Sequence, residues 1–239
     1  MGDWYYRSVV LICRHAFWVS SRVTVLHRDR VPRKGPFLLV SNHLSPLDPA
    51  VLIRHTPRRL DFVSTTEVFS KPLVGWFFNG MNAFPLERSR SDPKTARVII
   101  ERLKRGRVVA MFPEGRLRKE SDSIVHGKPM RPSSARTARV AGVPLVPAVV
   151  WGTPAYTRLR SWLPIKGTRY GVIYGHPITV TDDDAGERQL AEAIQQLYRE
   201  LREAMGGSFA AATSDDQAAA AAAPPPPSLT APSDRSQPA

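Results

Sequence analysis

The sequence predicts an α/β domain in which helices flank a largely parallel β-sheet. Strand-like and helix-like runs alternate between residues 31 and 205, a pattern typical of parallel strands joined by helices. Hydrophobic residues make up 42% of the 239 residues, which is enough for a packed core. The two ends differ in composition from the middle. We therefore expect an N-terminal helical segment (1–30), the α/β domain (31–205) and a tail (206–239).

Residues 4–23 are expected to form an amphipathic helix that associates with a membrane. Arg7, Arg14 and Ser21 recur at heptad spacing, so a helix would carry one narrow polar stripe on an otherwise apolar, aromatic-rich surface. Aromatic rings and arginines together suit the membrane interface. No apolar run of the sequence reaches the roughly 18–20 residues that a transmembrane helix needs. A helix packed on the protein's own core remains the alternative.

Strands are expected wherever a short apolar run is bounded by turn residues. The expected strands are at residues 36–41, 60–64, 82–86, 107–112, 144–150 and 169–175.

Helices are expected between these strands. Two Asp-Pro pairs, at residues 48–49 and 92–93, are helix-start signals, and Asp48 is interpreted as an N-cap. Two glycines, Gly106 and Gly142, are helix-end signals. The last helix has its apolar residues on one face. The expected helices are at residues 48–55, 92–106, 133–142 and 187–205.

The overall composition restricts the partners and the compartment. The formal net charge of +13 favours a polyanionic partner, such as nucleic acid, anionic lipid or a phosphorylated substrate. Cys13 is the single cysteine, so no internal disulfide can form and a reducing compartment is expected. The tail is rich in Ala, Pro and Ser and is expected to be disordered.

Polar clusters follow three of the expected strands. Residues 42–48 (NHLSPLD) follow the first strand, Glu87 and Arg88 follow the strand at 82–86, and residues 113–119 (PEGRLRK) follow the strand at 107–112. The carboxyl ends of parallel strands meet at one edge of the sheet, where ligand sites of open α/β sheets form. We therefore expect these clusters to converge on one site.

His43 and Asp48 have two interpretations. In one, Asp48 only caps a helix and His43 is a polar loop residue. In the other, His43 is a general base and Asp48 orients its imidazole. The sequence contains no G-x-S-x-G elbow, phosphate loop or H-E-x-x-H zinc helix. A His/Asp pair without an obvious Ser or Cys nucleophile suggests activation of a hydroxyl on the substrate.

Four ordered motifs resemble the lysophospholipid and glycerolphosphate acyltransferases, especially the bacterial 1-acyl-glycerol-3-phosphate acyltransferases. The resemblance covers about residues 35–177. The first family motif, N-H-x-x-x-x-D, is matched by residues 42–48, and residues 80–88 (GMNAFPLER) are similar to the glycine-to-arginine motif that follows it. The third, F-P-E-G-T-R-S, is matched by residues 112–115, and the fourth by residues 143–147 (VPLVP). A G-x-P-I strand end is matched at residues 175–178.

The resemblance implies transfer of a fatty acyl chain from acyl-CoA or acyl carrier protein to the hydroxyl of 1-acyl-glycerol-3-phosphate, giving phosphatidic acid in phospholipid biosynthesis. His43 would be the base and Asp48 would orient it, with no metal and no cofactor beyond the thioester co-substrate. The implied substrate-binding residues are Asn42, Arg88, Glu114, Gly115, Arg116 and Arg118. The enzyme would lie on the cytoplasmic face of the membrane as a peripheral or monotopic protein.

The third motif departs from the family, because Leu117 occupies the position of its arginine. Arg116 or Arg118 would have to replace that phosphate contact, and Lys128 and Arg131 are further basic candidates nearby. The altered motif leaves open another lysolipid, an ornithine lipid or a glycolipid as acceptor.

Three other points stay open at this level. The apolar residues 71–81 would line an acyl-chain groove, dip into the bilayer or simply pack in the core. A non-catalytic basic protein that binds nucleic acid or anionic membrane is the alternative of another class; it explains the charge but not the ordered motifs, so no nucleic-acid partner is expected. The sequence does not indicate the oligomeric state.

Overall fold

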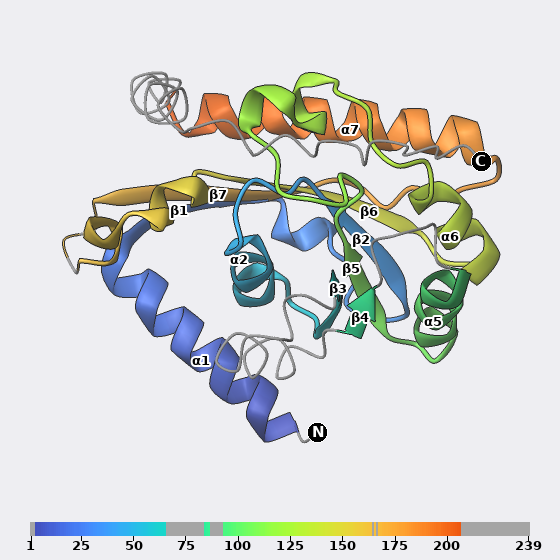
Figure 1. Cartoon of the computed structure of the whole chain (residues 1–239), viewed down its shortest axis with the longest axis horizontal. Helices are drawn as coiled ribbons and strands as arrows, with labels where there is room; N and C mark the ends of the chain where they lie inside the picture. Colours follow the sequence, from blue (N-terminus) through green and yellow to red (C-terminus); the bar gives the residue numbers. More distant parts are fainter. Residues whose placement is uncertain (1–2, 66–83, 87–92, 164, 166, 207–239) are drawn as a thin grey trace, which may run out of the picture. The chain divides into compact units, whose positions relative to one another are not determined.

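The structure is a computed structural model that describes residues 3–65, 84–86, 93–163, 165 and 167–206 (Figure 1). The chain divides into two compact units, Met1–Met205 and Gly206–Ala239. The second unit is described only at Gly206, so the predicted disordered tail lies outside the described residues. Residues 71–81 and Arg88 also lie outside them.

Within the described residues, seven strands form one sheet in the order β1-β7-β6-β2-β5-β3-β4. Every neighbouring pair is parallel except β6 and β7, which are antiparallel. The predicted fold class, an α/β fold on a largely parallel sheet, is therefore confirmed. The strands are β1 (Ser21–Leu26), β2 (Phe37–Ser41), β3 (Leu60–Thr65), β4 (Phe84–Leu86), β5 (Val108–Met111), β6 (Leu145–Trp151) and β7 (Thr168–Tyr174).

Helices flank the sheet on both faces (Figure 1). On one face α7 contacts β6 and β7, α6 packs beside α7, and α5 packs beside α6. On the other face α1 and α2 pack together. The helices are α1 (Asp3–Ser20), α2 (Asp48–His55), α5 (Pro93–Lys104), α6 (Ser134–Ala141) and α7 (Asp183–Ala204), with short 3-10 helices η1 (Arg28–Arg30), η2 (Glu120–Asp122), η3 (Ile124–His126), η4 (Thr153–Thr157) and η5 (Leu159–Trp162).

The strands and helices predicted between residues 31 and 205 are all present, with small shifts at their ends. The largest shift is in α7, which begins at Asp183 rather than at residue 187. The Asp182 carboxylate accepts a hydrogen bond from the Ala185 N–H at 2.8 Å and so caps the helix earlier. The central strand β2 is completely buried from Phe37 to Val40, as expected for a parallel strand covered on both faces.

The N-terminal helix predicted from the sequence, residues 4–23, extends too far at its C-terminal end. It ends at Ser20, and Ser21–Leu26 forms strand β1, which pairs in parallel with β7. Val23, Thr24 and Val25 are β-branched and favour a strand once a partner strand is available. A strand of the sheet therefore lies within the segment 1–30 that was assigned to the helix.

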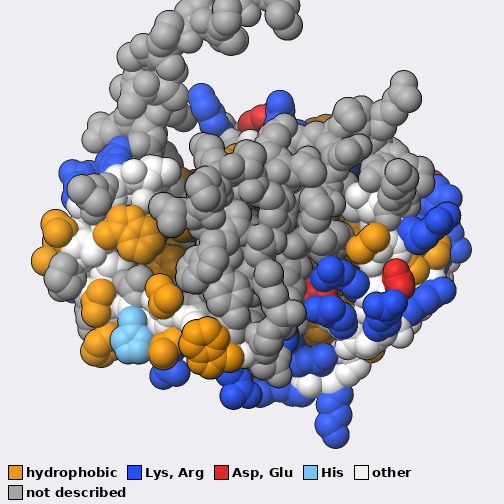
Figure 2. Space-filling model, turned by 60° about the horizontal axis from the view of Figure 1, so that its bottom comes forward, with side chains coloured by type: hydrophobic (Ala, Val, Ile, Leu, Met, Phe, Trp, Pro, Cys, Tyr) orange, Lys and Arg blue, Asp and Glu red, His pale blue; other side chains and the backbone are white. Residues whose placement is uncertain are grey.

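Helix α1 packs against the protein's own core at one position and carries exposed apolar side chains elsewhere. Phe17 is buried, with its ring 5.2 Å from the ring of Tyr156 and 5.3 Å from that of Tyr170. Trp4, Leu11, Ile12 and Trp18, in contrast, are exposed. Figure 2 shows exposed hydrophobic side chains on the side of the molecule where α1 lies. Among the described residues, no helix has the length and apolar character needed to cross a bilayer.

Candidate active site

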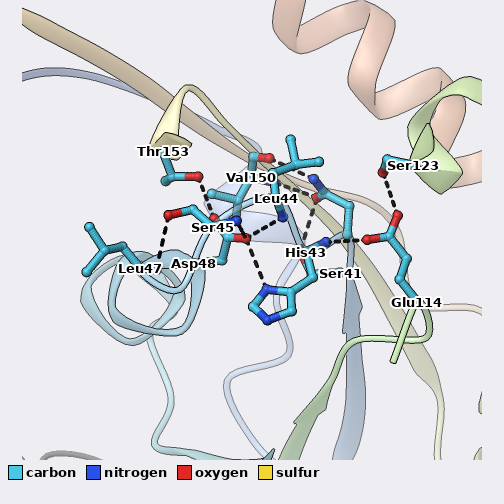
Figure 3. Close-up of polar contacts among 11 residues, drawn as sticks. Ser41, His43, Leu44, Ser45, Leu47, Asp48, Glu114, Ser123, Val150 and Thr153 are labelled. Carbon is cyan, nitrogen blue, oxygen red and sulfur yellow. Dashed lines mark hydrogen bonds and ion pairs between the residues drawn. The ribbon is translucent and has the colours of Figure 1, made fainter. Parts of the chain in front are cut away.

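His43 and Asp48 lie together at the carboxyl end of the central strand β2. The chain leaves β2 at Ser41, and the turn at residues 44–47 brings the start of α2 back toward the imidazole (Figure 3). The His43 Nδ1 atom is 3.2 Å from the Asp48 Oδ2 atom. Asp48 is not the N-cap of α2, because Leu47 holds that position and Asp48 is the first helical residue.

The Asp48 carboxylate is completely buried and surrounded by donors. Its Oδ2 atom accepts hydrogen bonds from the Leu44 N–H at 2.7 Å and the Ser45 N–H at 2.8 Å, besides facing His43. Its Oδ1 atom accepts a hydrogen bond from the Thr153 hydroxyl at 2.5 Å. These protein groups replace the water that a buried carboxylate loses.

The His43 ring is oriented for proton transfer. A carboxylate only accepts hydrogen bonds, so the proton shared with Asp48 belongs to Nδ1 and leaves Nε2 as an acceptor. No described residue forms a hydrogen bond with Nε2. The Phe112 ring stacks on the imidazole, with centroids 4.1 Å apart and an interplanar angle of 15°. The side chain is 18% exposed, and its geometry suits a general base.

The backbone of His43 is held by the loop that carries the third motif. The His43 N–H donates to Glu114 Oε2 at 2.8 Å, and the His43 carbonyl accepts from the Arg118 N–H at 2.9 Å (Figure 3 shows the Glu114 contact). The first and third motifs, which the sequence analysis expected to converge, are therefore in direct contact.

Glu114 uses both carboxylate oxygens within the protein. Its Oε1 atom accepts hydrogen bonds from the Ser123 hydroxyl at 2.5 Å and the Ile124 N–H at 2.8 Å, and Oε2 accepts from His43. The side chain is buried. Glu114 therefore connects the His43 backbone to the N-terminal end of η3. This arrangement suits a residue that shapes the loop.

Asn42 connects β2 to β6. Its amide nitrogen donates to the Val150 carbonyl and its amide oxygen accepts from the Val150 N–H, both at 2.9 Å. The side chain is completely buried. The amide thus satisfies two backbone groups of β6 next to the site. This geometry fixes the start of the His43 turn, whereas the sequence analysis grouped Asn42 with the substrate-binding residues.

The basic residues of the third motif lie on the loop that contacts His43. Arg116 is exposed, and the Arg118 guanidinium donates to the Asp122 carboxylate at 2.8 Å. Leu117, which replaces the family arginine, is 46% exposed. The Arg131 guanidinium covers Gly115, where a Cβ atom would lie 2.7 Å from it.

Gly115 itself has a φ of +67°, so glycine is the residue that fits this turn best.

Among the described residues, no group of three or more His, Cys, Asp and Glu side chains is arranged to hold a metal ion.

Four residues that contact this site were missed in the sequence analysis: Ser123, Ile124, Val150 and Thr153. Ile124 and Val150 contribute only backbone atoms, and Ser123 lies in a stretch without a distinctive pattern. Thr153 follows the buried strand β6, so it has the same topological position as the clusters after β2 and β5. The rule that identified those clusters would also have identified Thr153.

Comparison with known proteins identifies similarity to acyltransferases. The family model described as acyltransferase matches residues 22–151. The chain is similar to the 1-acyl-sn-glycerol-3-phosphate acyltransferase of Bacillus subtilis (strain 168), with 25% identity over 189 residues, 77% of this chain and 89% of that protein. It is similar to the enzyme of the same name in Streptococcus pneumoniae, with 25% identity over 207 residues, 83% of this chain and 72% of that protein.

Two further similarities concern the acceptor and the fold. The chain is 36% identical over 116 residues to the lyso-ornithine lipid O-acyltransferase of Pseudomonas aeruginosa, covering 48% of this chain and 43% of that protein. It shares its fold with the crystal structure of the 1-acyl-sn-glycerophosphate (LPA) acyltransferase PlsC from Thermotoga maritima. The TM-score is 0.67 at 21% identity, covering 82% of this chain and 79% of that one.

Proposed function

The chain belongs to the acyltransferase family, and we propose that it transfers a fatty acyl group from a thioester to the free hydroxyl of 1-acyl-glycerol-3-phosphate, giving phosphatidic acid. The observation that carries this proposal is the His43–Asp48 pair, whose geometry suits a base that activates a substrate hydroxyl. The names of the similar proteins in Bacillus subtilis and Streptococcus pneumoniae support the choice of acceptor.

The reaction takes place in one displacement at the thioester carbonyl. The acceptor hydroxyl gives its proton to His43 Nε2 while its oxygen attacks the carbonyl carbon. Asp48 holds the Nδ1 proton and stabilises the imidazolium that forms. When the C–S bond breaks, the imidazolium returns the proton to the leaving thiolate. The products are an ester and a free thiol, and no acyl-enzyme forms. The donor is acyl-CoA or acyl carrier protein.

Arg88 and one arginine of the loop that contacts His43 are proposed to hold the acceptor phosphate. Arg88 is assigned one contact from the sequence motif, and Arg116 or Arg118 the contact that Leu117 cannot make, since Arg binds phosphate with two hydrogen bonds at once. The backbone bond between Arg118 and His43 supports this assignment, because it places the loop beside the base. Asn42, Glu114 and Gly115 support the phosphate site by shaping its loops.

The test is a kinetic comparison of Arg116→Ala, Arg118→Ala and the double variant on lysophosphatidate and on a neutral lysolipid. We expect the KM for lysophosphatidate to rise on loss of the responsible arginine, and a Lys variant to recover only part of the loss. Arg136→Ala, an exposed arginine on α6, is the matched control. Equal losses on both acceptors, or no loss on either, would contradict the phosphate assignment.

Two observations favour a second acceptor class. Leu117 occupies the position of the motif arginine, and the chain is 36% identical over 116 residues to a protein named lyso-ornithine lipid O-acyltransferase. An acceptor panel that contains lysophosphatidate, lyso-ornithine lipid and a lysoglycolipid, with acyl-CoA and acyl carrier protein as donors, would separate these possibilities by mass spectrometry of the products. Membership of an enzyme family goes against the non-catalytic, nucleic-acid-binding alternative.

Helix α1 is proposed to hold the enzyme on the membrane surface as a peripheral or monotopic protein. Trp4, Leu11 and Trp18 recur at heptad spacing and are exposed together, and Arg7 and Arg14 are exposed beside them. Exposed aromatic rings next to arginines suit the interface of an anionic bilayer. Location on the cytoplasmic face remains a prediction that rests on the single cysteine.

The membrane proposal is best tested by point substitutions, since β1 belongs to the sheet and Phe17 belongs to the core. The variant Trp4→Ser/Leu11→Ser/Trp18→Ser should lose most of its co-sedimentation with vesicles that contain anionic lipid and keep its thermal unfolding midpoint. Val140→Ser, an exposed apolar position on α6, is the control. Unchanged vesicle binding of the triple variant would place the anchor elsewhere.

A further inference from the structure

The end of strand β6 makes a sharp turn beside the catalytic pair. Gly152 follows the last strand residue with a φ of +85°, and a Cβ atom there would lie 2.4 Å from the Arg169 carbonyl oxygen. Only glycine fits such a position. The turn directs the next residue, Thr153, back toward the start of α2, where it is completely buried.

The Thr153 hydroxyl and the Asp48 carboxylate form a short, buried hydrogen bond. The Oγ1 and Oδ1 atoms are 2.5 Å apart, a length typical of a hydroxyl that donates to an ionised oxygen (Figure 3). The two residues are 105 positions apart in the sequence. Among the described residues, Thr153 is the only donor to Oδ1, whereas the donors Leu44, Ser45 and His43 all contact Oδ2.

This division of donors fixes the rotation of the carboxylate. Two backbone N–H groups hold Oδ2 from one side, and the Thr153 hydroxyl holds Oδ1 from the other. With both oxygens fixed, Oδ2 stays directed at His43 Nδ1. Without the hydroxyl, a buried carboxylate oxygen would lack its donor, which is unfavourable in the absence of water. The carboxylate would then rotate, or bind a proton, to recover a partner.

We propose that Thr153 is a positioning residue for acyl transfer, the outer member of a Thr153–Asp48–His43 series in which the hydroxyl orients the carboxylate and the carboxylate orients the imidazole. The inference rests on the proposed function of His43 as the base. Thr153 itself does not touch the substrate. It acts on the reaction through Asp48, so its loss should lower kcat and leave the KM for both substrates nearly unchanged.

Matched variants separate this role from a purely structural one. Thr153→Val keeps the shape of the side chain and removes the hydroxyl. Thr153→Ala removes the hydroxyl and the methyl group, and Thr153→Ser keeps the hydroxyl donor and removes only the methyl group. Thr157→Val is the control, because Thr157 lies in the same short helix and its exposed hydroxyl donates only to the Pro154 carbonyl in the described structure. All variants are measured as full-length protein, with thermal unfolding midpoints.

The first experiment measures kcat and KM with the acceptor that the wild type uses best, from pH 5 to 9. Thr153→Val and Thr153→Ala should lower kcat about 5- to 150-fold, which corresponds to the loss of one buried donor. The pH–rate profiles of these two variants should differ from that of the wild type, because Asp48 is held differently against the His43 ring. Thr153→Ser and Thr157→Val should resemble the wild type. In the Asp48→Asn background, Thr153→Val should have little further effect.

The second experiment needs no substrate. Nitrogen-15 NMR of the histidine rings should show His43 in the wild type with its proton on Nδ1, and in Thr153→Val a shift toward a mixture of tautomers. A wild-type enzyme that acylates no lysolipid would defeat the proposed function while this measurement still tests the orientation of His43. A kcat for Thr153→Val within twofold of wild type, or unfolding of both Val and Ala variants, would overturn the inference. An unchanged pH profile and an unchanged tautomer would overturn it as well.

Discussion

A histidine lies near each end of helix α2: His43 precedes the helix and His55 is its last residue. One faces a carboxylate, and the other faces a hydroxyl near arginine charges. At the start of the helix, His43 faces the buried Asp48 carboxylate at 3.2 Å. At the end of the helix, His55 Nε2 lies 2.8 Å from the Tyr170 hydroxyl. Burial, with the Arg54 and Arg28 charges, lowers the pKa of His55 to about 3.

The comparison illustrates how the neighbours of an imidazole favour or oppose its protonation. A carboxylate on one ring nitrogen supports the positive charge that the ring acquires when it takes a proton. Burial and arginine charges oppose that positive charge, so His55 stays neutral and serves as a partly buried hydrogen-bonding partner of Tyr170. Loss of a partner at the first end of α2 should therefore lower turnover, and at the second end it should lower stability.

The largest effect is expected at the reactive end. His43→Ala should lower kcat about 10²- to 10⁴-fold, the usual contribution of a general base. The unfolding midpoint should stay close to that of the wild type, because the side chain lies in a loop and is partly exposed. His55→Gln, assayed in parallel at neutral pH, should keep most of the activity. Near-normal turnover by His43→Ala would show that the mechanism is wrong.

Asp48→Asn should reduce kcat almost as far as His43→Ala. The amide cannot support the imidazolium, and its NH₂ group must face one of the donors that now surround the carboxylate. We also expect the free energy of unfolding to fall by about 1–3 kcal/mol, because a buried donor loses its acceptor. Chemical denaturation and steady-state kinetics measure the two effects separately. If Asp48→Asn were inactive because it is unfolded, the loss of activity would be an effect on stability, which would contradict the predicted direct effect on kcat.

His55 should make the fold sensitive to acid. Its pKa is about 3 in the folded protein and about 6.5 in the unfolded chain, so the unfolded chain binds the extra proton between these values. The stabilisation is complete above pH 6.5 and is lost as the pH falls toward 3. Between pH 7 and pH 5 the loss should be about 2 kcal/mol.

Urea denaturation at both pH values tests this prediction for the wild type and for His55→Gln, whose stability should change less over the same range. His176→Gln, an exposed histidine, is the control and should follow the wild type. Parallel curves for wild type and His55→Gln would mean that His55 takes up no proton on unfolding in this range.

The smallest effect is expected at the partner of His55. Tyr170→Phe removes the hydroxyl and keeps the ring, which is completely buried and in contact with Phe17. The free energy of unfolding should fall by about 1 kcal/mol, the typical net value of one hydrogen bond. Turnover at neutral pH should not change. A clear loss of turnover in Tyr170→Phe would contradict this prediction and would mean that the two ends of α2 are coupled.

The sequence by itself determined the fold class, the strands and helices of residues 31–205, and the convergence of the first and third motifs. These features depend on local signals, such as apolar period, helix-start and helix-end residues, and the rule that parallel strands end at one edge of the sheet. The proximity of His43 and Asp48 is also local, because five residues and one turn separate them.

Only the tertiary structure decided what these residues contact across the sheet. Asn42 reaches Val150 over 108 positions, and Asp48 reaches Thr153 over 105, because β6 lies beside β2. That strand order depends on which distant strands pair, and no short stretch of sequence contains it. The same reason explains why β1 was predicted as the end of a helix: its six residues become a strand only where β7 offers an edge.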